Sequence, residues 1–308
     1  RAEGVKPIIG CEVYVAPRTR FDKEGKRDAS GNHLILLCKN QKGYENLIYM
    51  VSKSFTEGFY QKPRIDLDLL RTHADGLIAL SACLAGYIPR AIVSGDFAGA
   101  RQYARTLAGI FGEGNFYLEL QDHGIPEQRE VNAELITMAK ELSLPLVATN
   151  DVHYLRRLDA EHQAVMMCIQ TGRTLAEGKP IGFETEEFYY KSTAEMEKLF
   201  GDVPEALANT VRIADACDFE FMFGNLYLPK IAVSNGKTPF EQLRTFTFAG
   251  LENYATVLRN PYFSVAIKNT LLFSIVTTLG KVGFGLALAL LVNNRFRGVN
   301  YMRTVFFL

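Results

Sequence analysis

The chain has 308 residues, 48% of them hydrophobic, so it can bury the core of one large domain or of two smaller ones. Its formal net charge is zero, but residues 1–244 carry 28 Lys and Arg against 33 Asp and Glu, whereas residues 245–308 carry 6 basic residues against Glu252 alone. The mildly acidic body is expected to bind nucleic acid poorly and without specificity, unless its basic groups are clustered or a cation intervenes.

The five cysteines are widely spaced and form no Cys-x-x-Cys pair. This spacing argues against a zinc ribbon or a disulfide framework and favours a reducing cytoplasm for residues 1–244. The sequence begins at Arg1 without Met and shows no secretory leader. Because a strand-like run follows almost at once, we expect the chain to begin inside a domain.

Strand-like and helical patterns alternate through the first part of the chain. Apolar runs predict strands at 7–15, 34–37, 76–84, 116–120 and 146–148, with a loop at 18–31. Helical spacing predicts helices at 44–58, 96–111, 127–142 and 159–169, and cap signals start two more near Ser192 and Pro204. Strands alternating with helices predict an α/β fold with a parallel sheet or a barrel.

The strand at 146–148 leads directly into Asp151 and His153. Side chains two residues apart in an extended backbone point the same way, so this carboxylate and imidazole can project together. That combination suits a divalent cation such as zinc or manganese. The alternative is that both are turn residues that end a strand.

Two further residues sit at or near the ends of predicted strands. Glu12 lies in an apolar run, where an unpartnered buried carboxylate is costly, although it could instead face solvent on an edge strand. Cys83 follows the third strand and could instead be a small buried hydrophobe. In an α/β barrel, chemistry collects where strands end, so Glu12, Cys83, Asp151 and His153 are predicted to meet around zinc or a similar ion.

The other histidines fit this pattern less well. His33 begins its strand, and on pattern alone it is a structural histidine. His123 follows the strand at 116–120 but could equally belong to a turn. His73 and His162 are predicted to lie on the surface.

Five segments carry a resemblance to a known family. They are Lys6-Pro-Ile-Ile-Gly-Cys-Glu-Val-Tyr-Val15, Asn32-His-Leu-Ile-Leu-Leu37, Ser81-Ala-Cys-Leu-Ala-Gly86, Tyr117-Leu-Glu-Leu-Gln-Asp-His-Gly124 and Ala148-Thr-Asn-Asp-Val-His-Tyr154. In this order they resemble the PHP (polymerase and histidinol phosphatase) domain, specifically that of the alpha subunit of bacterial DNA polymerase III. The resemblance covers about residues 1–244 and continues through Leu228-Pro-Lys and Thr238-Pro-Phe-Glu-Gln-Leu-Arg244.

The resemblance implies a distorted seven-stranded β/α barrel that holds divalent metals, zinc, manganese or magnesium. The positions that match the family's metal ligands are Glu12, His33, Cys83, Asp151 and His153. Family members hydrolyse phosphoester bonds, and in some polymerases the domain proofreads the 3′ end of the primer. The implied partners are primer-template DNA and the other subunits of the polymerase holoenzyme.

Two parts of the family pattern are missing from the sequence. Its opening His-x-His motif would lie upstream of Arg1, and the polymerase palm would lie downstream. We therefore expect a barrel incomplete at its N-terminus, a weakened metal site and neither polymerisation nor efficient cleavage of DNA.

The tail differs in character from the body. Residues 271–292 form a largely apolar run whose only charge is Lys281, and such a run can span ~30 Å of hydrocarbon. Lys281 near its middle costs about 2.5–3.5 kcal/mol, which the apolar neighbours can offset. Arg295, Arg297 and Arg303 would mark the cytoplasmic end. The alternative is a buried core helix.

Within the tail, Phe248-Ala-Gly-Leu-Glu-Asn-Tyr254, Lys268-Asn-Thr-Leu-Leu-Phe273 and residues 285–308 resemble a sugar-type ABC transporter permease. We therefore predict two parts, 1–244 and 245–308, joined as a chimera. The three functional hypotheses are a fragment of a replicative polymerase in the cytoplasm, a transport protein in the inner membrane, and a metal-free module that docks polymerase partners.

Overall fold

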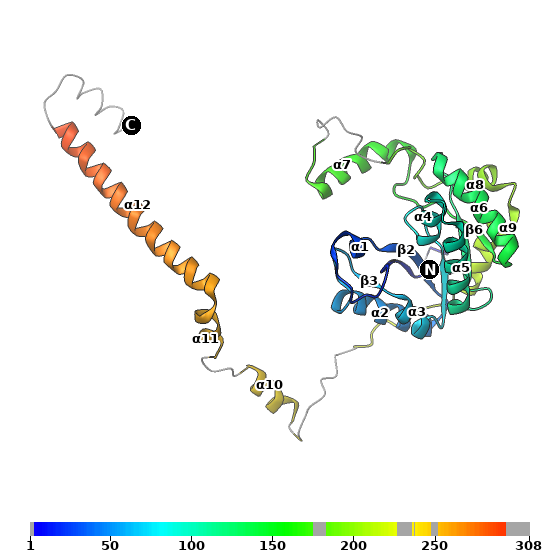
Figure 1. Ribbon diagram of the computed structural model, residues 1–308, viewed down its shortest axis with the longest axis horizontal. Coiled ribbons are helices and arrows are strands. Elements are labelled where there is room, and N and C mark those ends of the chain that lie inside the picture. Colours follow the sequence, from blue (N-terminus) through cyan, green and yellow to red (C-terminus); the bar gives the residue numbers. More distant parts are fainter. Residues whose placement is uncertain (1–2, 175–182, 227–235, 237, 248–251, 294–308) are drawn as a thin grey trace. The chain divides into compact units, whose positions relative to one another are not determined.

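The computed structural model describes residues 3–174, 183–226, 236, 238–247 and 252–293 (Figure 1). The chain divides into two compact units, Arg1–Phe223 and Gly224–Leu308. The predicted motif at 228–230, the basic residues Arg295, Arg297 and Arg303, and the permease-like stretch from 294 onward lie outside the described residues.

Unit 1 is built on a six-stranded mixed sheet with the order β3-β1-β2-β4-β5-β6. The strands are β1 (Gly10–Val15), β2 (Asn32–Cys38), β3 (Arg64–Ile65), β4 (Leu77–Leu80), β5 (Phe116–Leu120) and β6 (Leu146–Ala148). β2 pairs antiparallel with β1 and β4, while β1–β3, β4–β5 and β5–β6 are parallel pairs. Among the described strands, β2 alone therefore runs against the others.

The direction of β2 corrects the prediction of a parallel sheet. A parallel connection needs a crossover, usually a long helix, whereas β1 and β2 are joined by a polar segment with only the short α1 (Gly25–Ala29). Because this segment contains no long crossover helix, β2 pairs with β1 in the antiparallel direction. Within the described residues β3 and β6 are the two ends of the sheet, so closure into a barrel is not seen there.

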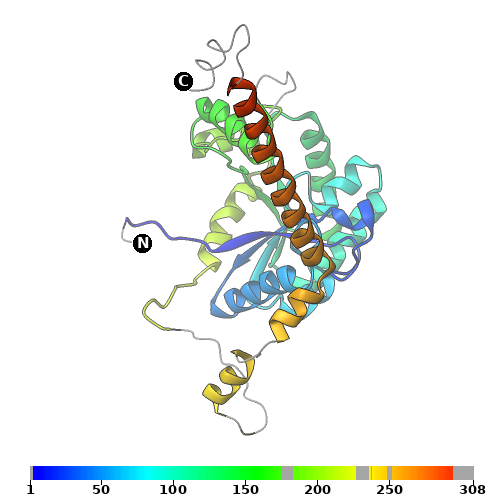
Figure 2. The same ribbon diagram turned by 90° about the vertical axis from the view of Figure 1, so that its left-hand side faces the viewer.

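Helices pack against the sheet, and those on one face enclose the main core (Figure 2). The helices of unit 1 are α2 (Gln41–Thr56), α3 (Leu67–His73), α4 (Tyr87–Val93), α5 (Phe97–Phe111), α6 (Pro126–Leu142), α7 (Ala160–Thr171), α8 (Thr193–Phe200) and α9 (Pro204–Ala216). The main core takes most of its helical residues from α2 to α6, whereas α9 also packs on the opposite face. Alternation along the strands explains the arrangement: in β2, Leu34 and Leu36 are buried under helices, while His33 and Ile35 face the other side.

The opposite face of the sheet carries a second, smaller apolar cluster. Ile78 and Leu80 of β4 pack there with Tyr117 and Val147, and α9 adds Ile213. The same face carries the His33 side chain at the start of β2, so one side of the sheet builds the core and the other presents polar groups beside a small apolar patch.

Most predicted elements are present, with shifted ends. The strand at 116–120 and the capping roles of Asp96 and Ser192 are confirmed, since both side chains accept hydrogen bonds from backbone N–H groups. The loop at 18–31 contains α1, and α3, α4 and β3 were not predicted. These three are short, and two-residue β3 has no periodicity from which it could be recognised.

Unit 2 contains α10 (Pro239–Thr247), α11 (Glu252–Arg259) and α12 (Pro261–Asn293). α12 has 33 residues, so it begins ten residues before the predicted apolar run and is ~50 Å long. Its stretch Pro261–Ala287 is long and apolar enough to cross a membrane and is 0% buried. The alternative of a buried core helix is wrong for this unit as described.

Candidate metal centre

The reversed direction of β2 decides which residues share an edge of the sheet. The carboxyl ends of β4 and β6 lie at one edge because the strands from β4 to β6 are parallel. The amino end of β2 lies at that same edge because β2 is antiparallel to β4. His33 therefore starts its strand beside the turn that ends β4, which removes the reason for reading it as a structural residue.

Three side chains meet at this edge. Glu12 Oε1 lies 3.1 Å from His33 Nδ1, and Cys83 Sγ lies 3.6 Å from the same nitrogen. One ligand atom from each residue lies within 4.8 Å of the other two. The hydrogen bond with Cys83, and then that with Glu12, raises the pKa of His33 to about 10 in the absence of an ion.

Backbone pairing places each member of this cluster. Tyr14 of β1 lies opposite His33, so Glu12, two residues earlier, projects from the same face toward the imidazole. The turn after β4 docks on the start of β2, since His33 N donates to Ala85 O at 3.1 Å. Gly86 closes this turn because a Cβ there would lie 2.4 Å from Ser81 O. Cys83 is thereby held next to His33.

Asp151 and His153 form a second group after β6. Asp151 Oδ1 lies 3.4 Å from His153 Nε2, and Asp151 adopts a positive φ of 40°. His153 is fixed by a hydrogen bond from its N–H to Phe188 O at 2.9 Å. Burial opposes ionisation of Asp151, but the hydrogen bond and charge of His153, helped by His123 and His33, hold the pKa of its carboxyl below the usual range.

The five predicted ligands thus lie in two groups on the same edge. Glu12, His33 and Cys83 are in ligand contact with one another, and Asp151 pairs with His153. His33 contributes to the electrostatic environment of Asp151, which links the two groups. That all five hold one shared set of ions remains a prediction.

Glu119 was missed by sequence reasoning, although it connects the turns that carry the ligands. This buried carboxylate accepts hydrogen bonds from Ala82 N at 2.9 Å and from Thr149 Oγ1. Ala82 precedes Cys83 and has a positive φ of 64°, and Thr149 precedes Asp151 by two residues. Burial raises the pKa of Glu119, and its hydrogen bonds oppose that shift. A charged residue inside the run Phe-Tyr-Leu-Glu-Leu was the signal, the same one that drew attention to Glu12.

His123 lies in the interior and not in the cluster. Its ring stacks on Phe188 with centroids 4.0 Å apart, and its Nε2 lies 2.9 Å from Asn150 O. Gln128 contacts its Nδ1, so both ring nitrogens already have protein partners. His162 is exposed as predicted, whereas His73 is half-buried and stacks on Tyr49 at 4.5 Å.

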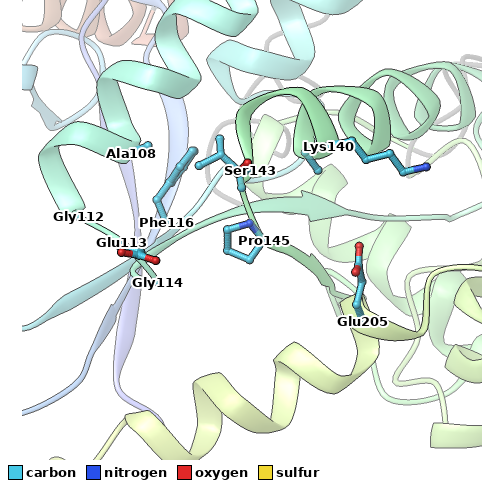
Figure 3. Close-up of a pocket in the computed structure, with 11 residues that line it drawn as sticks. Ala108, Gly112, Glu113, Gly114, Phe116, Lys140, Ser143, Pro145 and Glu205 are labelled. Atoms are coloured by element: carbon cyan, nitrogen blue, oxygen red, sulfur yellow. The ribbon is translucent and has the colours of Figure 1, made fainter.

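A cavity of about 680 Å³ lies away from these groups (Figure 3). Its walls include Phe116, the first residue of β5, and Pro145, which precedes β6. The cavity is thus at the amino ends of these strands, whereas the predicted ligands lie at the opposite edge. Lys140 and Glu205 stand at its margin in Figure 3, and none of the five predicted ligands lines it.

The donor set fits a divalent cation of intermediate softness. Carboxylate oxygen, imidazole nitrogen and thiolate sulfur together are typical ligands for zinc, and the carboxylates also suit manganese. The Glu12 oxygen and the Cys83 sulfur lie close to His33 Nδ1. Atoms that bind the same ion lie at similar distances from one another, and all three atoms here lie within 4.8 Å of one another. The residues present therefore fit a metal ion.

Comparison with known proteins relates the chain to one family of domains and to one group of proteins. Residues 1–123 match the PHP domain family. The DNA polymerase III subunit alpha of Treponema pallidum is 42% identical over 262 residues, which cover 83% of this chain and 22% of that protein. The subunit of Borreliella burgdorferi is 46% identical over 254 residues (81% and 22%), and that of Thermus aquaticus 42% over 260 (81% and 21%).

Residues 1–123 are therefore similar to PHP domains, and about four-fifths of the chain is homologous to the alpha subunit of DNA polymerase III. It spans about a fifth of the length of these curated relatives. None of these findings supports the resemblance of residues 246–308 to a transporter permease.

Proposed function

We propose that unit 1 is a metal-dependent phosphoesterase module that acts on the 3′ end of a nucleic acid strand, in the context of a replicative polymerase. The observation that carries this proposal is the contact of Glu12, His33 and Cys83 at the sheet edge where Asp151 and His153 also lie. The homology to polymerase III alpha subunits supports DNA and holoenzyme subunits as partners. Five free cysteines favour the cytoplasm as its location.

The residues at this edge of the sheet have different roles in the proposed metal site. Glu12, Cys83 and Asp151 supply negative charge that would hold zinc, manganese or magnesium, and His33 and His153 supply neutral nitrogen when deprotonated. A bound divalent ion acidifies water and stabilises negative charge on phosphoryl oxygens. Glu119 keeps the Cys83 and Asp151 turns at a fixed separation through Ala82 and Thr149.

We expect hydrolysis to be slow in this chain, although a cation binds. Five ligands suffice to hold one ion, whereas a second ion, which steadies the leaving oxygen in two-metal sites, would have to share them. Manganese-dependent release of 3′ nucleotides at a rate lost in Asp151→Asn would show that the second ion is also held and that this expectation of slow turnover is wrong.

Metal binding is tested by calorimetric titration of the chelator-treated protein with Zn²⁺ and Mn²⁺. We expect near-stoichiometric binding of Zn²⁺ that weakens at least tenfold in Cys83→Ser and in His33→Gln. His162→Gln is the matched control, because this histidine is 82% exposed and outside both groups. Absence of binding by the wild-type protein would favour the alternative hypothesis, a metal-free module that docks polymerase partners.

A second candidate property rests on α12, whose apolar surface is exposed along its described length. We propose that residues 271–292 enter the bilayer of the inner membrane. The permease resemblance of 246–308, and with it a chimeric origin of the chain, stay proposals based on the sequence. Sequencing reads of the gene that run without interruption across the codons for residues 240–250 would establish that one gene encodes both parts. Reads that stop at this point would show that the two parts come from different genes.

A further inference from the structure

We propose that Lys62, held in place by Tyr14, contacts a phosphate of the nucleic acid strand whose end occupies the metal centre. This inference rests on the proposed function and names the part of the protein that would recognise the substrate strand. Tyr14 of β1 lies next to the cluster of Glu12, His33 and Cys83.

Tyr14 lies between the cluster and Lys62. Its ring makes an edge contact with His33, with centroids 5.0 Å apart and planes at 87°. On its other side, Lys62 Nζ donates to Tyr14 Oη at 3.0 Å and lies 4.6 Å from the ring centroid. One aromatic ring thus connects a ligand imidazole to an ammonium group.

The positions of both residues are fixed by close backbone contacts. Gly31 packs against Tyr14 so closely that a Cβ at position 31 would lie 2.5 Å from Tyr14 Cβ. Lys62 lies just before β3, which pairs with β1 at Tyr14 and Arg64. Gln61, with a positive φ of 59°, forms the tight bend that presents Lys62.

Arg64 anchors this bend in the protein interior. Its side chain is fully buried and donates to Gly58 O at 3.1 Å and Asp28 O at 2.6 Å. A buried guanidinium bound to backbone carbonyls holds β3 against the body with little freedom. Lys62, two residues away and exposed, is thereby kept at the rim while its charge stays accessible to solvent.

The charge of Lys62 has no acidic partner among the described residues. By contrast, Lys53 pairs with Glu57, and Arg101 pairs with Glu134 and Glu141. An ammonium has three donors, and the Tyr14 hydroxyl uses one. The remaining donors, next to a centre built for a phosphoryl group, fit a further phosphate of the same strand. Proteins that bind single strands combine such cations with aromatic side chains.

The test is a titration of the full chain, in a non-ionic detergent that covers α12, with a fluorescent oligothymidylate, followed by anisotropy with and without Mn²⁺. We expect Lys62→Ala to weaken binding about tenfold, and Lys62→Arg to restore most of it. The slope of log K against log salt should fall by about 0.7 in Lys62→Ala, the value for one lost phosphate contact on a single strand. Lys140→Ala, an exposed lysine beside the cavity of Figure 3, is the matched control and should bind as wild type.

The outcomes separate this inference from the proposed function. Unchanged Mn²⁺ affinity with weakened oligonucleotide binding in Lys62→Ala supports the inference. If the wild-type protein binds no Mn²⁺, the proposed function fails, yet a Lys62-dependent affinity and salt slope without metal still support the contact. Equal affinity and equal salt slope of Lys62→Ala and wild type, with or without Mn²⁺, would overturn it. Thermal melts of each variant verify that the exposed substitutions leave the fold intact.

Discussion

Two buried carboxylates explain much of how the ligand-bearing segments are held. Glu119 stabilises a left-handed Ala82 beside Cys83, a conformation that a non-glycine residue adopts at a cost. Asp28 is fully buried in the segment between β1 and β2, where Arg18 binds both of its oxygens. Protein donors take the place of water around each of these buried carboxylates. Removing a carboxylate therefore leaves those donors without their hydrogen-bond acceptor.

Replacing Glu119 with Ala should destabilise unit 1 by about 2–4 kcal/mol, because the Ala82 N–H is left unsatisfied and a cavity forms. Glu119→Gln should cost less, since it keeps the shape and one acceptor. Thermal unfolding followed by circular dichroism measures both. A Glu119→Ala protein that melts with wild type would show that the Ala82 turn is held by other contacts.

The Asp28 carboxyl predicts a pH dependence of stability. The hydrogen bond from Arg18, which outweighs the opposing effect of burial, lowers the pKa of Asp28 to about 2 from an ordinary value of 3.8. A depressed carboxyl pKa stabilises the folded state above the ordinary value, and this stabilisation is lost as the pH falls from 3.8 through 2.

Urea unfolding midpoints between pH 5 and pH 2 test this directly. We expect the difference in midpoint between wild type and Asp28→Asn to shrink as the pH is lowered, because protonation removes the charge that the substitution has already removed. Glu195, whose pKa is also about 2, lies in the capping box of α8 and should be unaffected by this variant. A difference that is constant with pH would contradict the assignment.

At the scale of elements, contact between backbones sets the spacing of α2 and the turn before β4. Gly43 in α2 lies against Gly76, and a Cβ at position 43 would be 1.9 Å from Gly76 O. Asn40 caps α2 by accepting from Gly43 N at 3.0 Å, so the start of the helix is fixed at this contact. No shift of a side chain alone can relieve a clash with a carbonyl oxygen.

Gly43→Ala should therefore lower the free energy of unfolding by about 1–3 kcal/mol, or by more if the helix cannot move. Gly109→Ala in α5 is the matched control, since a Cβ there meets nothing within 4 Å. That variant should be stabilised by about 0.5–1 kcal/mol because alanine favours helix. Chemical denaturation of both proteins gives the comparison, and equal effects of the two substitutions would refute it.

The elements that sequence alone identified are those with strong local signals. The strand at 116–120 is apolar throughout except for Glu119, and α5 has both an N-cap and helical spacing, so both were located within a residue. β3 and the direction of β2 were not predicted, because strand pairing depends on contacts between distant segments.

The five candidate ligands were likewise named from strand ends and family resemblance. The position of His33 beside Cys83 could not be predicted, because it depends on the antiparallel direction of β2. Glu119 was overlooked because its partners, Ala82 and Thr149, are far apart in sequence.

At the scale of the whole molecule, two units of different character share one chain. Unit 1 buries its apolar residues around a sheet, whereas α12 exposes large apolar side chains such as Leu272, Phe273 and Leu279 along its length. Exposed apolar surface of this extent is unfavourable in water and marks an interaction with lipid or protein. The two units therefore have different solvent requirements.

Association with lipid should depend on the apolar surface of α12. We expect the full chain to float with phosphatidylcholine vesicles, and a double variant, Val276→Lys with Leu279→Lys, to remain mostly in the soluble fraction. Each lysine near the middle of a span costs about 2.5–3.5 kcal/mol. The control substitutes Leu226, an exposed residue outside α12, with Lys. Equal flotation of the double variant and wild type would show that α12 does not provide the attachment.

The reversed course of β2 has a consequence for the order of events during synthesis. Glu12 and His33 emerge from the ribosome early, yet the partners that would complete the centre, Cys83 and then the Asp151 turn, emerge much later. If all five residues bind one ion, a nascent chain that ends before β6 would hold that ion only loosely. Metal loading would therefore be a late event that reports the completed sheet, and an ion supplied to stalled nascent chains of increasing length should be retained only after residue 153 has left the exit tunnel.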